Sequence, residues 1–362
     1  MRIGIDAREL SGQPTGVGRY LAALLREWAA DERARRHEYI LYAPRPLGVA
    51  VERRGVTVRT VPGRAVAGTW WEQVPLVRAA AADHLDVFFA PAYTAPMRLR
   101  VPTVVTIHDL SYAAHPEWFR LREGIRRRWL TRHAARRAAC IITDSLFSRD
   151  EIVEHLRLPA SRVRVIVPGI DPPAVSDAAA YAEPRVLYVG SIFNRRRVPA
   201  LIRAFAQLLR TRPDASLDIV GGNRTYPHED IGGLIERAEL SGRVRWHEYV
   251  SDQRLSELYS RARAFAFLSE YEGFGMTPLE ALAVGVPPIV LDTPIARESC
   301  GAAAIFVPRD DPAAVTPALE TALFDEPARA RILAAAPAVL ARYSWPRAAR
   351  ETIDALELMA HG

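Results

Sequence analysis

The most informative segment of the chain carries two glutamates around a glycine loop and reads SEYEGFGMTPLE from residue 269. It predicts a strand, a loop and then a helix, with Thr277 as the N-cap and Pro278 at the first helical position. Glu272 lies in the loop, and Glu280 follows eight residues later in the first turn of the helix. Backbone amides at a helix N-terminus attract phosphates, while a carboxylate accepts hydrogen bonds from ribose hydroxyls. The segment therefore favours a nucleotide site, and the alternative is that Glu280 only complements the helix dipole.

A cluster of arginines follows the strand that opens the second half of the chain. Gly190 comes directly after this strand, and Arg195, Arg196 and Arg197 stand a few residues further on. Each guanidinium presents a planar fork of donors that suits the oxygens of a diphosphate. The other interpretation is a solvated run of charge, and the cluster alone does not decide between the two.

Two loops of the first half also have residues that suit chemistry. Gly16 and Gly18 lie in GQPTGVGRY, which starts at residue 12, and glycines before a helix let backbone amides approach a phosphate. The spacing differs from the dinucleotide fingerprint because Leu21 takes the place of the third glycine, so a flexible turn is the alternative. His108 and Asp109 end an apolar strand, where polar side chains point into a ligand site. The alternative there is a strand-end cap with a satisfied histidine.

Short runs rich in Val, Ile and Phe alternate with segments of helical period along the whole chain. In the first half, the predicted strands are 2–6, 39–43, 56–61, 87–90, 103–108 and 141–144, and the predicted helices include 17–30 and 118–139. In the second half, the predicted strands are 185–189, 216–220, 243–247, 264–268, 288–291 and 303–307, with helices at 199–210 and 229–240. This alternation is typical of parallel sheets covered by helices on both faces.

A break rich in proline and glycine separates the two halves and predicts a linker. We therefore expect an α/β protein with two Rossmann-like, doubly wound domains that face each other across a cleft. The first domain spans residues 1–170, the linker 171–184 and the second domain 185–344. A C-terminal helix at 345–362 is expected to pack back on the first domain. In open sheets of this kind ligands bind outside the carboxyl ends of the strands, which is where the four loops above lie.

The composition excludes several classes of protein. The chain has 362 residues, which suits two domains, and its 48 basic residues are all arginine. Mechanisms that need a lysine amine are therefore excluded, among them those of pyridoxal-phosphate enzymes and P-loop nucleotidases. The net charge of +6 favours an acidic partner. Cys140 and Cys300 lack metal-ligand spacing and are expected to be reduced thiols. The sequence predicts neither a signal peptide nor an apolar run of membrane-spanning length. We therefore expect a cytoplasmic protein.

Taken together, these segments resemble family 4 of the retaining glycosyltransferases, which have the GT-B fold, over nearly the whole chain. The strongest element is the E-x7-E motif from Glu272 to Glu280. The supporting segments, in chain order, are IDARELSGQPTGVGRY, TIHDLSYAAHPEWF, TDSLFSRDEI, VRVIVPGID, residues 187–205 and HEYVSDQRLSELYSRARAFAFLSEYEGFG. Several ordered elements with consistent spacing are far more specific than any one of them.

The resemblance implies a role for each candidate residue. Glu280 corresponds to the carboxylate that binds the nucleotide ribose, and Glu272 to the one that contacts the transferred sugar. His108 and Asp109 are expected near the reacting centre. The family's diphosphate-binding lysine corresponds to Arg196, and Ser191 stands where many members carry an arginine. The residues expected to bind the phosphates and the sugar of the donor are Gly16, Gly18, Gly190, Arg195, Arg196, Phe274 and Gly275.

The resemblance also implies a mechanism, which is transfer with retention at the anomeric carbon. Negative charge builds on the departing diphosphate, and arginines with a helix N-terminus can stabilise it without a metal. The chain has no DxD triplet, so neither a metal nor a cofactor is expected. We adopt the front-face substitution discussed for this family, in which the leaving phosphate deprotonates the acceptor.

The expected partners are a nucleotide-sugar donor and a glycan or lipid-linked glycan acceptor. Mannose from GDP-mannose is the favoured donor, with glucose, rhamnose and N-acetylglucosamine donors as the alternatives. The product would belong to a cell-surface polysaccharide such as lipopolysaccharide. No nucleic-acid-binding motif is present, so nucleic acid is not an expected partner. The alternatives are another activity on the GT-B fold, such as a nucleotide-sugar epimerase, and a catalytically inactive basic scaffold.

A basic segment from Arg120 to Arg137 suggests a further partner. Arginines at 122, 126, 127, 128, 132 and 136 alternate there with Trp129 and Leu130, and Trp118 and Phe119 precede them. A basic amphipathic helix is typical of contact with an anionic membrane surface. We therefore expect peripheral association with the inner face of the plasma membrane, and the alternative is an ordinary helix of the domain.

Overall fold

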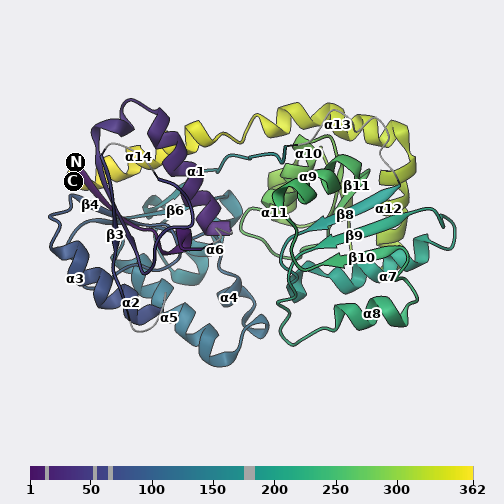
Figure 1. The fold of residues 1–362 in the computed structure, drawn as a ribbon, viewed down its shortest axis with the longest axis horizontal. Coiled ribbons are helices and arrows are strands. Elements are labelled where there is room, and N and C mark those ends of the chain that lie inside the picture. The colour runs from purple at the N-terminus through teal and green to yellow at the C-terminus, as the bar shows by residue number, and fades with distance from the viewer. Residues whose placement is uncertain (13–15, 52–54, 64–67, 175–183, 362) are drawn as a thin grey trace. The chain divides into compact units, whose positions relative to one another are not determined.

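The computed structural model describes residues 1–12, 16–51, 55–63, 68–174 and 184–361 (Figure 1). The chain divides into two compact units. The first comprises Met1–Ala114, Leu121–Gly169 and Ser344–Gly362, and the second comprises His115–Arg120 and Ile170–Tyr343. Each unit is built on its own parallel sheet, so the prediction of two Rossmann-like domains is confirmed. Most of the predicted linker, residues 175–183, lies outside the described residues.

The sheet of the first unit has the order β3-β2-β1-β4-β5-β6-β7. Its strands are β1 (Arg2–Asp6), β2 (Glu38–Ala43), β3 (Val56–Thr60), β4 (Val87–Ala90), β5 (Thr103–Thr106), β6 (Cys140–Thr143) and β7 (Val163–Val165). The direction of winding reverses between β1 and β4, which pair in parallel. Loops that follow strands at such a switch point form the usual ligand site of the fold.

Helices cover both faces of this sheet, and the last helix of the chain is one of them. The helices are α1 (Gly16–Ala30), α2 (Thr69–Gln73), α3 (Pro75–Ala81), α4 (Ser111–Ala114), α5 (Leu121–Arg137), α6 (Leu146–Leu156) and α14 (Trp345–His361), with short 3₁₀ turns at Arg8–Leu10, Ala34–Arg36 and Ala160–Arg162. In Figure 1 the yellow α14 lies beside the purple α1. The indole nitrogen of Trp28 donates to the carbonyl of Ala349, 2.9 Å away, and this contact fastens the chain's end to the first core.

The sheet of the second unit has the order β10-β9-β8-β11-β12-β13. Its strands are β8 (Arg185–Val189), β9 (Ser216–Val220), β10 (Val244–His247), β11 (Ala264–Phe267), β12 (Pro288–Leu291) and β13 (Ile305–Val307). Its helices are α7 (Val198–Leu208), α8 (Ile231–Arg237), α9 (Asp252–Arg261), α10 (Met276–Ala283), α11 (Pro294–Cys300), α12 (Pro312–Phe324) and α13 (Glu326–Leu340), with 3₁₀ turns at Pro116–Trp118 and Asn194–Arg196. The winding reverses between β8 and β11, so the second switch point joins the arginine cluster to the Glu272 loop.

One short segment departs from the predicted organisation. Residues 115–120 were expected inside the first domain, partly in a helix that begins at Trp118, but they belong to the second unit, and α5 begins at Leu121. The rings of His115 and Trp118 stack 3.9 Å apart, and both meet Tyr271 edge-on at 5.2 and 6.3 Å. Aromatic packing on the loop that carries Glu272 therefore replaces the predicted first turn of the helix.

The strand predictions fail mainly where polar residues meet the carboxyl ends. The strand predicted to reach His108 ends at Thr106, because the following residues turn away to form loop contacts. β7 was not predicted as a strand, since its three residues merge with the proline-rich break that follows. Among the described residues, no helix is both long enough and apolar enough to span a bilayer.

Candidate active site

Gly190 occupies a position that only glycine fits at the end of β8. Its φ of +143° is rare for residues with a side chain, and an added Cβ would lie 2.6 Å from Nη1 of Arg196. The same guanidinium donates through Nη1 to the carbonyl of Ser191 at 3.0 Å. The absence of a side chain at Gly190 therefore leaves room for the guanidinium of Arg196 to lie against the backbone at the switch point of the second sheet.

Arg196 and Glu272 form a buried ion pair at this switch point. Nε of Arg196 donates to Oε1 of Glu272 at 2.8 Å, and Nη2 lies 3.3 Å from Oε2, so the contact is bidentate. Both side chains are 15% exposed. The hydroxyl of Ser269 donates to the same carboxylate at 2.9 Å. The guanidinium also lies 5.0 Å from the ring centre of Phe267, which adds a cation–π contact.

The electrostatics of this pair are fixed by the neighbouring guanidiniums. Burial alone would raise the pKa of Glu272, but the charges of Arg196 and Arg195 outweigh it and lower the pKa below its ordinary value. Burial likewise opposes the charge of Arg196, yet the carboxylate of Glu272 raises its pKa. Arg195 lies further out, with Nε 3.9 Å from Oε1 of Glu272. Two guanidiniums thus face one carboxylate, which leaves positive charge for a phosphate.

Arg197 is separated from this group by its other partners. Its Nη2 lies 2.6 Å from Glu270, and its Nε lies 3.5 Å from Asp310. The residue has a left-handed backbone with φ of 49° and stands at the cap of α7, which turns its side chain away from Glu272. Of the three arginines in the cluster, the structure therefore brings Arg195 and Arg196 to the glutamate and sends Arg197 elsewhere.

The N-cap of α10 differs from the predicted one. The helix begins at Met276, and Gly275 takes the cap position with a φ of 84°, so Thr277 is not the N-cap and Pro278 is not at the first helical position. Glu280 consequently lies beyond the first turn, where its side chain is only 6% exposed. The left-handed glycine begins the helix earlier than a Thr-Pro signal predicts. The N-terminus of the helix still follows the Glu272 loop directly.

Phe274 is placed by packing. Its side chain is 7% exposed, and its ring meets Tyr343 edge-on with centroids 5.3 Å apart. The hydroxyl of Tyr343 donates to the carbonyl of Ser299 at 2.6 Å, which fixes that ring in turn. The side chain of Phe274 is therefore committed to packing within the second unit.

His108 is the candidate whose surroundings in the first unit are most fully determined. Nδ1 lies 2.7 Å from Oδ2 of Asp144, and Nε2 lies 2.9 Å from the carbonyl of Pro91. Burial lowers its pKa, but the charge and hydrogen bond of Asp144 reverse this, and the net effect raises the pKa. Tyr20 and Tyr93 meet the ring edge-on at 5.0 and 5.6 Å. This is the satisfied histidine that the sequence left as the alternative, and it lies at the carboxyl edge of the sheet.

Asp109 is also committed to local contacts. Oδ1 accepts from the backbone amide and the hydroxyl of Ser111, at 2.9 and 2.8 Å, and Oδ2 accepts from the hydroxyl of Tyr93 at 3.1 Å. Gly16 and Gly18 lie in the first turn of α1, while residues 13–15 of the predicted phosphate loop lie outside the described residues. The structure therefore supplies positions for both glycines but not for the whole loop.

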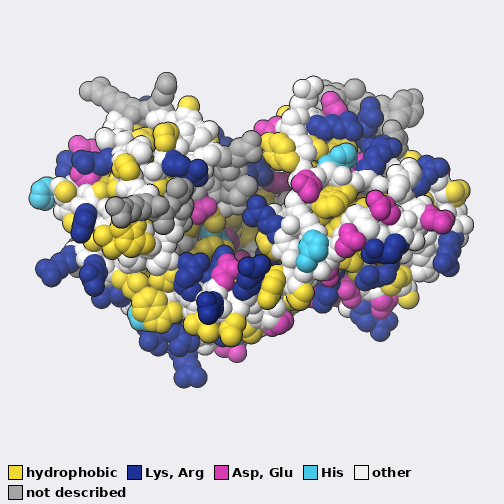
Figure 2. Space-filling view, turned by 60° about the horizontal axis from the view of Figure 1, so that its bottom comes forward, with side chains coloured by type: hydrophobic (Ala, Val, Ile, Leu, Met, Phe, Trp, Pro, Cys, Tyr) yellow, Lys and Arg dark blue, Asp and Glu magenta, His cyan; other side chains and the backbone are white. Residues whose placement is uncertain are grey.

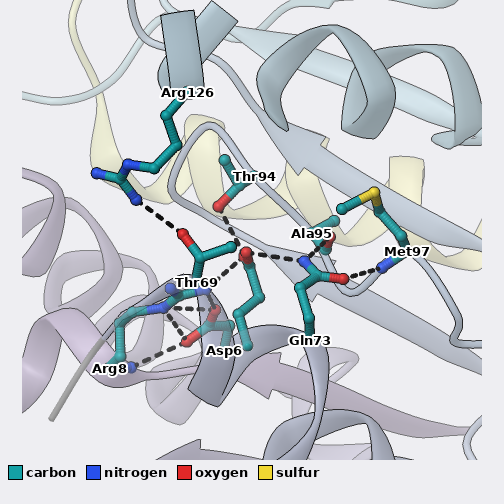
Figure 3. A network of polar contacts seen from close by, with 9 residues as sticks. Asp6, Arg8, Thr69, Gln73, Thr94, Ala95, Met97 and Arg126 are labelled. Carbon is teal, nitrogen blue, oxygen red and sulfur yellow. Dashed lines mark hydrogen bonds and ion pairs between the residues drawn. The ribbon is translucent and has the colours of Figure 1, made fainter. Parts of the chain in front are cut away.

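A buried network of hydrogen bonds and ion pairs near the end of β1 was not predicted from the sequence (Figure 3). Nε of Arg8 donates to Asp6 at 2.8 Å, and its Nη2 contacts Glu72 at 2.5 Å. Thr94 donates to the same carboxylate at 2.6 Å, and Gln73 donates to it at 3.0 Å. Glu72 is 1% exposed, and its hydrogen bonds to Arg8 and Thr94 tie together the segments that follow β1 and β4. No feature of the sequence predicted this network, since Glu72 lies 64 residues beyond Arg8.

Comparison with known proteins agrees with this architecture. The family described as glycosyltransferase family 4 matches residues 14–173, and the family described as glycosyl transferases group 1 matches residues 177–339. The chain is 29% identical over 291 residues to O-antigen chain mannosyltransferase B of Escherichia coli, with 76% of each chain covered. It is 30% identical over 264 residues to alpha-D-kanosaminyltransferase of Streptomyces kanamyceticus, with 68% of each covered.

Solved structures show the same fold. Sucrose-phosphate synthase from Thermosynechococcus elongatus superposes with a TM-score of 0.79 at 20% identity and covers 100% of both chains. Anabaena HepE, solved with UDP and glucose, superposes with a TM-score of 0.76 at 19% identity and covers 99% of both chains. These are GT-B structures, as the sequence predicted. The chain therefore belongs to the group 1 and family 4 glycosyltransferases, and it is an enzyme that transfers a sugar from a nucleotide-sugar donor.

Proposed function

We propose that this enzyme transfers mannose from GDP-mannose, with retention at the anomeric carbon, to a glycan or lipid-linked glycan of a cell-surface polysaccharide. The observation that carries the proposal is the Arg196–Glu272 pair at the switch point of the second sheet, beside the N-terminus of α10. Similarity to an O-antigen chain mannosyltransferase supports the choice of mannose and of a glycan acceptor. Similarity to a structure holding UDP and glucose supports a nucleoside diphosphate sugar at this fold.

The site divides the work of the reaction between its charged groups. Arg195 and Arg196 are the groups that would hold the diphosphate and stabilise the charge that it gains as the glycosidic bond breaks. Glu272, kept ionised by these guanidiniums, would meet the hydroxyls of the transferred sugar. Glu280 would accept from the ribose. No metal or cofactor enters this proposal, so chelation should leave the rate unchanged.

The surroundings of His108 and Asp109 favour a front-face substitution. A general base needs a free lone pair within reach of the acceptor proton. Both ring nitrogens of His108 face acceptors, so neither offers a free lone pair. The carboxylate of Asp109 accepts three hydrogen bonds, which hold it against Ser111 and Tyr93. This supports the leaving phosphate as the base that deprotonates the acceptor. A glycosyl adduct on Glu272, trapped and seen by mass spectrometry, would contradict that step.

The first test is saturation-transfer NMR with GDP-mannose, UDP-glucose, UDP-N-acetylglucosamine and dTDP-rhamnose, without added metal. We expect selective binding of GDP-mannose that Glu280→Ala abolishes and that Glu236→Ala, an exposed helix position, leaves intact. Selective binding of another donor would replace mannose in the proposal. Binding of none would favour an inactive scaffold. Transfer to a lipid-linked acceptor, followed by NMR of the new anomeric proton, then tests retention.

We extend the proposal to the membrane, on the exposed face of α5. Leu121, Ile125 and Trp129 recur every four residues and are 75%, 55% and 52% exposed, so they form one apolar ridge. Exposed arginines flank this ridge at 122, 126, 127, 132 and 136. Figure 2 shows dark-blue and yellow side chains gathered together on the part of the first unit that comes forward. A ridge of this kind suits an anionic bilayer, where the apolar side chains enter and the arginines meet headgroups.

Sedimentation with anionic vesicles tests this surface. We expect binding to be lost when Arg126, Arg127 and Arg128 are replaced by Glu, and weakened when Leu121, Ile125 and Trp129 are replaced by Ser. The matched control replaces exposed arginines of the second unit, at 203, 210 and 245, by Glu. Equal loss in the control would reduce the effect to net charge, and unchanged binding in the α5 variants would refute the membrane contact.

A further inference from the structure

The segment TDSLFS, residues 143–148, holds the backbone on both sides of His108. The hydroxyl of Thr143 donates to the carbonyl of Ile107 at 2.7 Å, and the hydroxyl of Ser148 donates to the carbonyl of His108 at 3.0 Å. Ser145 caps α6 by accepting from the amide of Ser148 at 3.0 Å, which fixes where Ser148 lies. All three hydroxyl-bearing residues are buried. The start of α6 therefore acts as a clamp on the end of β5.

The same segment fixes the ring of His108. Nδ1 lies 2.7 Å from Oδ2 of Asp144, and Nε2 lies 2.9 Å from the carbonyl oxygen of Pro91. A backbone carbonyl only accepts, so Nε2 must carry a proton to make its bond. A carboxylate also accepts, and since a carboxyl group is far more acidic than an imidazolium, the proton shared with Asp144 resides on Nδ1. The geometry thus requires a doubly protonated ring, or the loss of one of the two hydrogen bonds.

The groups around the ring preserve this charge. Asp144 and Asp109 both favour the charged form of the imidazole. Glu9, from the turn after β1, experiences the charge of His108 in return. The other faces of the ring are covered by the edge-on rings of Tyr20 and Tyr93. With 13% of its side chain exposed, His108 has little access to water that would replace its partners.

We propose that Asp144 and Ser148 are positioning residues that hold His108 as a fixed, doubly protonated imidazolium, and that the enzyme works with His108 in this form, so that His108 does not act as a base. The catalytic part rests on the proposed function, in which the leaving phosphate and not His108 deprotonates the acceptor. Loss of either ring proton would break one of the two hydrogen bonds that fix the ring. The proposal also gives the TDSLFS segment a role, which the resemblance alone did not.

The direct test is a long-range ¹H–¹⁵N NMR titration of histidine-labelled full-length protein, with the His108 signals assigned by their absence in His108→Gln. At pH 7.5 an ordinary imidazole, with a pKa of about 6.5, is mostly neutral. We expect both nitrogens of His108 to be protonated there, and Asp144→Asn to convert the ring to a single neutral tautomer. A neutral, single-tautomer His108 in the unaltered protein would overturn the proposal. This result does not depend on identifying the donor or on measuring transfer.

The catalytic part is tested by rates between pH 6 and 9. We expect the kcat of Asp144→Asn to fall as the pH rises, because its His108 loses the proton over a range where the unaltered enzyme keeps it. The KM for the donor should change little. Asp150→Asn removes an exposed carboxylate from α6, the helix that follows Asp144; it is the matched control and should follow the unaltered profile. If the NMR shows His108 neutral in Asp144→Asn while its pH–rate profile matches the unaltered enzyme, the charge does not serve the reaction. Should Asp144→Asn fail to fold, the titration of the unaltered protein still decides the protonation state.

Discussion

Each unit holds a buried charge pair at the switch point or carboxyl edge of its sheet, but the two pairs are balanced in opposite ways. In the second unit one carboxylate, Glu272, faces the guanidiniums of Arg196 and Arg195. In the first unit one imidazolium, His108, faces Asp144 with Asp109 nearby. The second site has cationic charge to spare for a phosphorylated donor, whereas the first has its cation fully occupied. The comparison indicates that the first pair is closed on its own partners, whereas the second leaves positive charge for the phosphorylated donor that we propose.

The largest effect should come from removing the carboxylate of the donor-side pair. Glu272→Ala leaves Arg196 buried and uncompensated, which should cost about 3–5 kcal/mol of unfolding free energy. The rate of transfer should fall on the order of 10²–10³-fold, as for loss of one preorganised electrostatic contact. Urea unfolding and initial rates measure the two quantities.

The neighbouring Glu270 is a matched control for this variant. It pairs with Arg197 at the surface, with 33% and 39% of the two side chains exposed, so Glu270→Ala should cost no more than about 1 kcal/mol. Equal losses for the two alanine variants would show that the Arg196–Glu272 pair is not specially buried. The Arg196–Glu272 pair could then no longer be compared with the His108–Asp144 pair as a second buried charge pair.

The two pairs should also make stability depend on pH in opposite directions. The pKa of Glu272 is lowered by folding, so its contribution is present above the ordinary value of 4.5 and is lost as the pH falls through the lowered pKa. The pKa of His108 is raised, so its contribution is full below 6.5 and is lost as the pH rises through the raised pKa. Each unit of pKa shift corresponds to about 1.4 kcal/mol.

Difference curves isolate these two contributions from the rest of the molecule. Unfolding free energies of Glu272→Gln and Asp144→Asn, subtracted from those of the unaltered protein, should vary with pH on the acid side and on the alkaline side respectively. Curves that vary on the same side would contradict the opposite balance of the two pairs. Asp150→Asn again supplies the control for a lost exposed carboxylate.

A smaller effect is expected from Gly190, which makes room for the donor-side pair. Gly190→Ala combines a left-handed backbone strain with a Cβ 2.6 Å from Arg196, and it should destabilise by about 1–3 kcal/mol. The displaced guanidinium should raise the KM for the donor. Gly222→Ala is the matched control, because an added Cβ there meets nothing within 4 Å. Thermal unfolding and donor titration compare the two, and an unchanged KM in Gly190→Ala would separate the glycine from the binding role of Arg196.

The sequence predicts the strands that carry both sites better than it predicts the side-chain partners within them. The runs 87–90 and 288–291 coincide with β4 and β12, because a buried parallel strand reads as a continuous apolar run. The candidates after β8 and β11 meet at one switch point, as expected from the fold. The partners of those candidates depend on which strands become neighbours. Asp144 reaches His108 across 36 residues only because β6 pairs with β5.

Predictions from local sequence fail where a residue adopts an unusual backbone conformation. Thr277 and Pro278 form a strong helix-start signal, yet α10 begins two residues earlier, at Met276, with Gly275 at the cap. Arg197 looks equivalent to Arg196 in sequence, but its left-handed backbone sends its side chain to Glu270. Neither outcome follows from composition or spacing, because each depends on a dihedral angle that tertiary contacts select.

Effects no larger than that of Gly190→Ala should come from the single hydroxyls that support the two pairs, and their order sharpens the comparison. Ser269 donates to the carboxylate of Glu272, a charged acceptor, so Ser269→Ala should cost about 1.5–3 kcal/mol. Ser148 donates to the neutral carbonyl of His108, so Ser148→Ala should cost about 0.5–1.5 kcal/mol. Urea unfolding ranks the two. A larger loss at Ser148 would mean that holding the His108 backbone matters more than balancing the Glu272 charge, which reverses the roles inferred for the two pairs.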